Sequence, residues 1–249
     1  VYAFRTAEEL PLHRAVFFEE ELRPASFFGQ QDSHLAMRDF FVARGYTLLD
    51  SSALQAFLWS RISDGAPSVV VAAMDALPPE LAPSAEGRSL LRHYLNAGGK
   101  ILWVGYPPGF RVLDEETHQW IATDRDAPKA LLGVDFSAFL GDRHGVLLTE
   151  AGREWGLTTR WVGSGSTTPA QVSEVLALDE VGRAAAWVKS YGGPRGTGFV
   201  LLRPSLSQGV LAEYQRVAEH FPSPGASLGK GASRVAGTGS HPSQTRDEP

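Results

Sequence analysis

The amino-acid sequence predicts an α/β fold, a three-layer sandwich in which helices cover both faces of a mostly parallel central sheet. Short apolar segments alternate along the chain with segments of helical periodicity, a pattern typical of strands joined by helical crossovers. Such crossovers are right-handed and make neighbouring strands parallel. The stretch "SVVVAAM" at residues 68–74 is almost entirely apolar, as expected of a central strand that is covered on both faces.

The first half of the chain contains the clearest alternation. Its strands are expected at residues 14–21, 46–52, 68–79 and 100–105. Its helices are expected at residues 32–45, 52–65 and 83–99. Asp32 or Ser33 offers an N-cap for the first of these helices, and Gly45 is expected to end it. The pair Gly98-Gly99 ends the third helix.

The second half is less regular and points to antiparallel pairing. Residues 110–139 are typical of a charged hairpin or excursion followed by a short helix, and residues 145–163 of a strand and a turn. Three apolar runs follow at residues 171–205, the last two joined by "YGGPRGTG", which predicts an antiparallel hairpin. A final helix is expected at residues 206–221. The complete prediction is a flavodoxin-like sheet with a C-terminal antiparallel hairpin.

Composition predicts one soluble globular domain at residues 13–221. With 249 residues, 43% of them hydrophobic, the chain can bury one sizeable core. Residues 1–12 are expected to be a lead-in, and residues 222–249, rich in Gly, Ser and Pro, a disordered tail or linker. No signal-peptide pattern is visible at the start, and no apolar stretch approaches the ~18 residues of a membrane span. The cellular location stays open.

Charge and residue usage exclude several classes of function. A net charge of −5, with 23 basic and 28 acidic side chains and no basic run, predicts no binding to nucleic acid. The chain has no cysteine, which excludes disulfides, thiolate metal sites and every cysteine nucleophile. Its seven histidines show none of the pairings typical of metal ligands. We therefore expect neither a metal site nor a cofactor.

Ligands of parallel α/β sheets bind where the strands end at their carboxyl side. The residues at these positions that could contact a small ligand are Glu19, Glu20, Asp50, Asp75 and Tyr106. Each also has a simpler interpretation. A glutamate run that leaves a strand is typical of a solvated loop, and an Asp before "ALPPE" suits a turn or a cap.

Several phrases occur in an order that resembles a known superfamily. They are "VVVAAMDALPPE", a helix ending in "YLNAGG", the strand "KILWVG", a charged excursion leading to "LLGVDF", and the late "GRAAAWVKSYGGPRGTGFVLL". Together they resemble the class I glutamine amidotransferase-like superfamily. Within it the chain is most similar to non-amidotransferase branches, such as the trehalose-utilisation-type proteins and the β-galactosidase trimerisation-type domains. The resemblance covers roughly residues 12–221.

The resemblance does not extend to the superfamily's usual chemistry. A working amidotransferase carries its nucleophilic Cys in a Gly-x-Cys-x-Gly elbow, with a His base and a Glu behind it. Here the elbow position falls at or next to Tyr106, and Pro107 and Pro108 follow it, where a helix with a free N-terminal amide would have to begin. Glutaminase activity is therefore rejected, and no residue is assigned a catalytic role.

Two functional classes remain. In the first, the domain is catalytically silent and binds a small ligand such as a sugar, or packs against a protein partner or a neighbouring domain. In the second, it is a carbohydrate-active hydrolase or isomerase that uses carboxylates such as Glu20 and Asp75 as acid and base. The first is preferred because the position that the fold gives to a nucleophile holds none.

Overall fold

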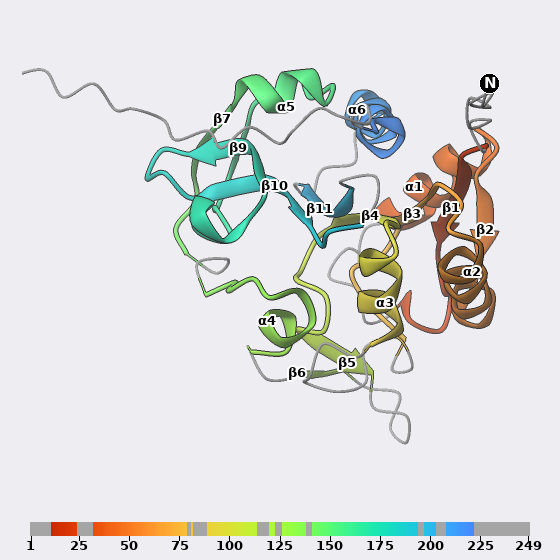
Figure 1. The fold of residues 1–249 in the computed structure, drawn as a ribbon. Coiled ribbons are helices and arrows are strands. Elements are labelled where there is room, and N and C mark those ends of the chain that lie inside the picture. Colours follow the sequence, from red (N-terminus) through yellow and green to blue (C-terminus); the bar gives the residue numbers. More distant parts are fainter. Residues whose placement is uncertain are drawn as a thin grey trace, which may run out of the picture.

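The computed structural model describes residues 11–23, 32–78, 81, 89–113, 120–122, 126–137, 141–193, 197–202 and 208–221 (Figure 1). The lead-in expected at residues 1–12 lies outside this description except for its last two residues. The tail or linker expected at residues 222–249 lies wholly outside it.

The predicted alternation in the first half is confirmed. The strands are β1 (His13–Phe17), β2 (Thr47–Leu49), β3 (Ser68–Ala72) and β4 (Lys100–Val104). The helices are α1 (Ser33–Val42), α2 (Ser51–Asp64) and α3 (Leu90–Asn96). Asp32 is the N-cap residue of α1, as expected, yet its side chain makes no capping hydrogen bond and its φ is 51°. Asp50 caps α2 and Ser89 caps α3 through their side chains.

The second half contains the expected hairpins and more strands than predicted. Its first elements are β5 (Arg111–Leu113), β6 (Trp120–Ala122), α4 (Ala127–Leu132), β7 (His144–Leu148), α5 (Glu150–Glu154) and β8 (Trp161–Gly163). The chain then forms β9 (Glu174–Asp179), β10 (Ala184–Ser190), β11 (Gly198–Leu202) and α6 (Gln208–Glu219). The turn expected within residues 145–163 is a short helix, because Thr149 accepts the N–H of Gly152 with its hydroxyl oxygen.

The central sheet is mixed, so the prediction of a mostly parallel sheet is wrong. Its nine strands have the order β2-β1-β3-β4-β11-β10-β9-β7-β8. The four pairings from β2 to β11 are parallel. The four from β11 to β8 are antiparallel, including the expected hairpin of β10 and β11. A separate antiparallel pair is formed by β5 and β6.

The mixed character follows from the connections between strands. Parallel neighbours need a crossover of a dozen or more residues, and the helices of the first half provide it. In the second half β9, β10 and β11 follow one another through short turns, which allow only antiparallel pairing. The tightest turn is stabilised by the buried side chain of Asp179, which accepts the N–H groups of Val181 and Arg183.

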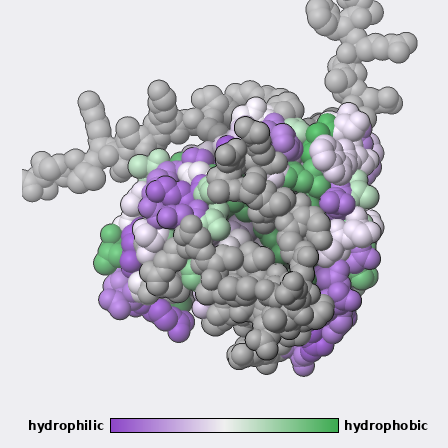
Figure 2. All heavy atoms as spheres, turned by 90° about the horizontal axis from the view of Figure 1, so that it is seen from below, coloured by the Kyte–Doolittle hydropathy of each residue, from purple (hydrophilic) through white to green (hydrophobic). Residues whose placement is uncertain are grey.

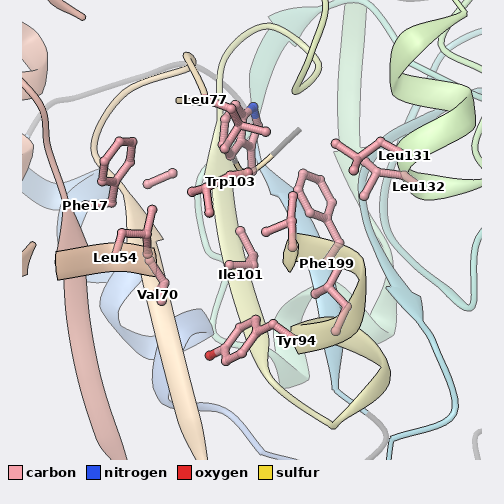
Figure 3. Packing of buried hydrophobic residues seen from close by; sticks show 14 of the residues in the cluster. Phe17, Leu54, Val70, Leu77, Tyr94, Ile101, Trp103, Leu131, Leu132 and Phe199 are labelled. Atoms are coloured by element: carbon pink, nitrogen blue, oxygen red, sulfur yellow. The ribbon is translucent and has the colours of Figure 1, made fainter. Parts of the chain in front are cut away.

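Two hydrophobic clusters cover the two faces of the sheet and create the layers. The first packs α2, α3 and α4 against side chains such as Val70, Ile101 and Phe199 (Figure 3). The second packs α1, α5 and α6 against the alternate residues Val69, Leu102 and Val200. Alternation along a strand therefore places both faces of β3, β4 and β11 in a core. On the face that carries α3 and α4, hydrophilic and hydrophobic side chains are interspersed around the rim (Figure 2).

Lys100 is a basic side chain that lies inside this apolar framework. Lys100, at the start of β4, is 0% exposed, and its ammonium group reaches the last turn of α6. Nζ donates to the carbonyl oxygens of Val217, Ala218 (3.2 Å) and His220 (2.7 Å). Burial lowers the pKa of Lys100 well below the usual value, and the carboxylate of Glu219 acts in the opposite direction. The side chain thus satisfies carbonyl groups that the helix leaves without partners at its end.

Candidate functional site

The candidate residues lie together at one edge of the sheet, because β2, β1, β3 and β4 are parallel and end on the same side. They follow the ends of these strands by one to three residues, in the positions Glu19, Glu20, Asp50, Asp75 and Tyr106. The structure connects four of them to neighbouring strand ends or helix starts by hydrogen bonds. The fifth, Glu20, is turned to a different partner.

Glu19 joins three elements. Its backbone N–H points to the sulfur atom of Met74, beyond the end of β3, at 3.3 Å. Its carboxylate Oε2 accepts the N–H of Ser51, the first residue of α2, at 3.0 Å. A carboxylate at this position also interacts favourably with the positive end of the helix dipole. Glu19 is half-buried, so this carboxylate stabilises the edge as well as lining it.

Asp50 has a local structural role. It is exposed and is the N-cap residue of α2, with extended backbone angles, φ −79° and ψ −175°. Its Oδ1 accepts the N–H of Ala53 at 2.8 Å. Together with the contact from Glu19 to Ser51, this places two carboxylates on the first turn of α2. The start of this helix is therefore already supplied with acceptors by the chain itself.

Asp75 and Tyr106 are brought into direct contact. Asp75 is only 5% exposed, and its side-chain Oδ2 accepts the backbone N–H of Tyr106 at 3.1 Å. The carbonyl oxygen of Tyr106 accepts the indole N–H of Trp103 at 2.6 Å. The backbone N–H of Tyr106 is thus bonded to a residue just after the end of β3, and its carbonyl oxygen to a residue of β4.

The segment after β4 turns away without starting a helix. The N–H of Phe110 donates to the carbonyl oxygen of Pro107 at 3.1 Å, with Pro108 and Gly109 between them. Gly109 has φ 81°, and proline followed by a positive-φ glycine is the pattern of a type II turn. The turn brings the ring of Phe110 parallel to that of Tyr106, with 5.5 Å between the ring centroids and 11° between the planes.

Glu20 does not join this arrangement. It is exposed, and its carboxylate forms an ion pair with Arg23 at 3.0 Å. Arg23 in turn reaches Asp32 at 2.6 Å. The ion pair holds the Glu20 carboxylate against the loop that follows β1 and not against Asp75 or Tyr106.

The chemistry available at this edge is that of a hydrogen-bonded, partly aromatic surface. Within the described parts of the chain, no group of three or more His, Cys, Asp or Glu side chains converges as metal ligands would. Sequence reasoning missed Met74, Trp103 and Phe110, which fix Glu19 and Tyr106 in place. The spacing of Trp103 and Phe110, three residues before and four after Tyr106, is the signal that could have indicated them.

The helices that the structure describes are all too short or too polar to cross a membrane. No curated protein and no solved structure shows a significant match to the chain. The model of the MJECL34 family matches residues 15–209, a span that runs from β1 into the start of α6 and includes every candidate residue. The chain belongs to the MJECL34 family.

Proposed function

We propose that the chain is a catalytically silent amidotransferase-like domain, a pseudoenzyme that binds a small ligand at the carboxyl edge of its parallel strands. The contact between Asp75 and Tyr106 is the observation that carries the proposal. In the superfamily that the sequence resembles, this region would hold the nucleophile. Here it holds a carboxylate and a tyrosine backbone that are bonded to each other.

The strand order supports the relationship to flavodoxin-like folds. The five strands β2-β1-β3-β4-β11 follow the 2-1-3-4-5 succession of those folds, with β11 in the place of the fifth strand. In such sheets ligands bind outside the carboxyl ends of the strands. The antiparallel strands β10, β9, β7 and β8 then extend this five-stranded parallel part on one side.

Electrostatics argue against acyl transfer at this position. Enzymes of that class stabilise a developing oxyanion with free backbone N–H groups beside the nucleophile. The N–H of Tyr106 is already bonded to the Asp75 carboxylate, whose negative charge would repel an oxyanion formed nearby. The Asp75 carboxylate would destabilise the oxyanion that acyl transfer needs to stabilise. This supports a domain that binds a ligand without turning it over.

The alternative, a carbohydrate-active hydrolase or isomerase, receives less support. Glycosyl chemistry needs two carboxyl groups about 5 to 9 Å apart that face one substrate. Glu20 is paired with Arg23, and Asp50 caps α2, so neither presents an unengaged carboxylate toward Asp75. A sugar stays the first ligand class to examine, because the resemblance is to domains associated with carbohydrate metabolism.

A titration followed by NMR tests the proposal directly. Glucose and galactose are added to the protein labelled with ¹⁵N, and the backbone amide signals of Ser51 and Tyr106 are recorded. We expect saturable shifts of both signals, lost in Tyr106→Ala and retained in Trp59→Ala, which removes an exposed aromatic side chain from α2. If neither sugar shifts either signal, a sugar ligand at this edge is rejected.

The silent character is tested separately with glutamine and with 4-nitrophenyl glycosides as substrates. We expect no turnover above that of buffer. Turnover that disappears in Asp75→Asn but persists in Glu21→Gln would overturn the proposal in favour of the hydrolase.

A further inference from the structure

Two half-buried cations lie close together on the face of the sheet that α3 and α4 cover. Arg92 belongs to α3, and Lys189 lies near the end of β10. Figure 1 shows α3 and α4 on the same side of β10 and β11. The guanidinium carbon of Arg92 is 4.1 Å from the ring centroid of Tyr191, which is two residues after Lys189.

Neither cation has a carboxylate partner within the part of the chain that the structure describes. Arg92 donates from Nε to the side-chain oxygen of Asn96 at 3.2 Å and from Nη1 to the carbonyl oxygen of Leu131 at 3.3 Å. Lys189 donates from Nζ to the carbonyl oxygen of Gln171 at 2.6 Å. Each of these acceptors is neutral, so no described residue compensates the two positive charges through these contacts. The Nη2 group of Arg92 and two N–H bonds of Lys189 are not used by these contacts.

The arrangement is electrostatically unfavourable as it stands. Burial lowers the pKa of Lys189, and the positive charge of Arg92 lowers it further. Like charges that are held together and partly removed from water destabilise a fold unless an anion offsets them. The ring beneath the guanidinium of Arg92 is itself held in place, since Tyr191 donates its hydroxyl to the carbonyl oxygen of Leu132 at 2.9 Å.

We propose that Arg92 and Lys189 form a binding site for the phosphate group of a small molecule. Two positive charges match the charge of a phosphate near neutral pH, which is close to two negative units, better than that of a carboxylate. Arginine supplies planar N–H donors to phosphate oxygens, and lysine adds a point charge. The site is separate from the carboxyl edge, because Lys189 pairs with Phe199 and Phe199 with Ile101, near the start of β4.

Thermal unfolding at fixed ionic strength tests this site. With inorganic phosphate as the probe, the Tm of the wild type should rise in a saturable way, and acetate should have a much smaller effect. Lys189→Gln keeps a donor for the carbonyl oxygen of Gln171 and removes one charge. We expect this variant to bind phosphate about tenfold more weakly or worse, and to be at least as stable as the wild type without phosphate.

Arg153→Gln is the matched control, because it removes one positive charge from α5 on the opposite face. It should keep the full response to phosphate. The proposal is overturned if the wild type shows no saturable response, if Lys189→Gln responds as the wild type does, or if acetate is as effective as phosphate. A Tm of Lys189→Gln below that of the wild type in phosphate-free buffer would also contradict it, since the lysine would then be purely structural.

Discussion

The carboxylate of Asp75 is bonded to the backbone N–H of Tyr106, so the ends of β3 and β4 are joined by a side chain and not only by the sheet. Asp75 is only 5% exposed at this junction. The indole of Trp103 holds the carbonyl group of the same tyrosine. The turn that carries the ring of Tyr106 is therefore fixed from both sides.

Replacing Asp75 tests how much this junction contributes to stability. Asp75→Ala leaves the N–H of Tyr106 without its acceptor, and we expect a loss of about 1 to 3 kcal/mol in the free energy of unfolding. Asp75→Asn retains an acceptor oxygen and should lose less. Urea unfolding of the two variants measures the difference, and equal losses would show that charge, not the hydrogen bond, is what matters.

Glu19 and Glu20 provide a matched pair of neighbouring carboxylates. Glu19→Gln weakens the bond to the first N–H of α2 and removes a negative charge from the helix start, which should cost about 1 kcal/mol. Glu20→Gln breaks only an exposed ion pair with Arg23 and should not change stability measurably. Chemical denaturation of both variants checks this, and a larger effect at Glu20 would contradict the assignment.

Asp179 should make stability depend on pH in the acid range. Its burial acts to raise the pKa, but hydrogen bonds from the backbone and guanidinium of Arg183 and from the N–H of Gly165 outweigh burial and lower it. A carboxyl group with a lowered folded-state pKa stabilises the protein above the ordinary value of about 3.9, and this contribution disappears as the pH falls through the folded-state pKa.

The variant Asp179→Asn should therefore be less stable than the wild type at pH 7, by about 1 to 3 kcal/mol. The difference between the two proteins should shrink as the pH falls below 4 or so. Thermal unfolding across this pH range measures it. A constant difference at all pH values would mean that the carboxylate charge has no part in stabilising the turn.

Lys100 should anchor the end of α6. Lys100→Met leaves three carbonyl groups of the last turn without their donor, and we expect a loss of about 2 kcal/mol. Hydrogen exchange should then accelerate at the end of α6 before the rest of the sheet opens. Lys129→Met, on the exposed side of α4, is the control and should change neither quantity.

Much of the fold and part of the candidate site could be predicted from local patterns. Residues 68–74 predict a strand that is covered on both faces. The stretch "GYPPG" predicts a turn that does not lead into a helix, because proline restricts the backbone and glycine permits a positive φ. Asp50 was placed only at the end of a strand, as a candidate ligand contact, and its role as the cap of α2 is seen in the structure. The sheet's mixed character was missed, since the pairing direction of β7, β8 and β9 depends on which strands meet.

The sequence by itself determined the alternation of strands and helices in the first half and the absence of any thiol. These follow from periodicity and residue identity, which act over a few neighbours. Only the tertiary structure decided that Asp75 meets Tyr106 while Glu20 meets Arg23, and that Lys100 is buried under α6. Such contacts join residues far apart in the chain or select one of several nearby partners, so packing, and not local propensity, determines them.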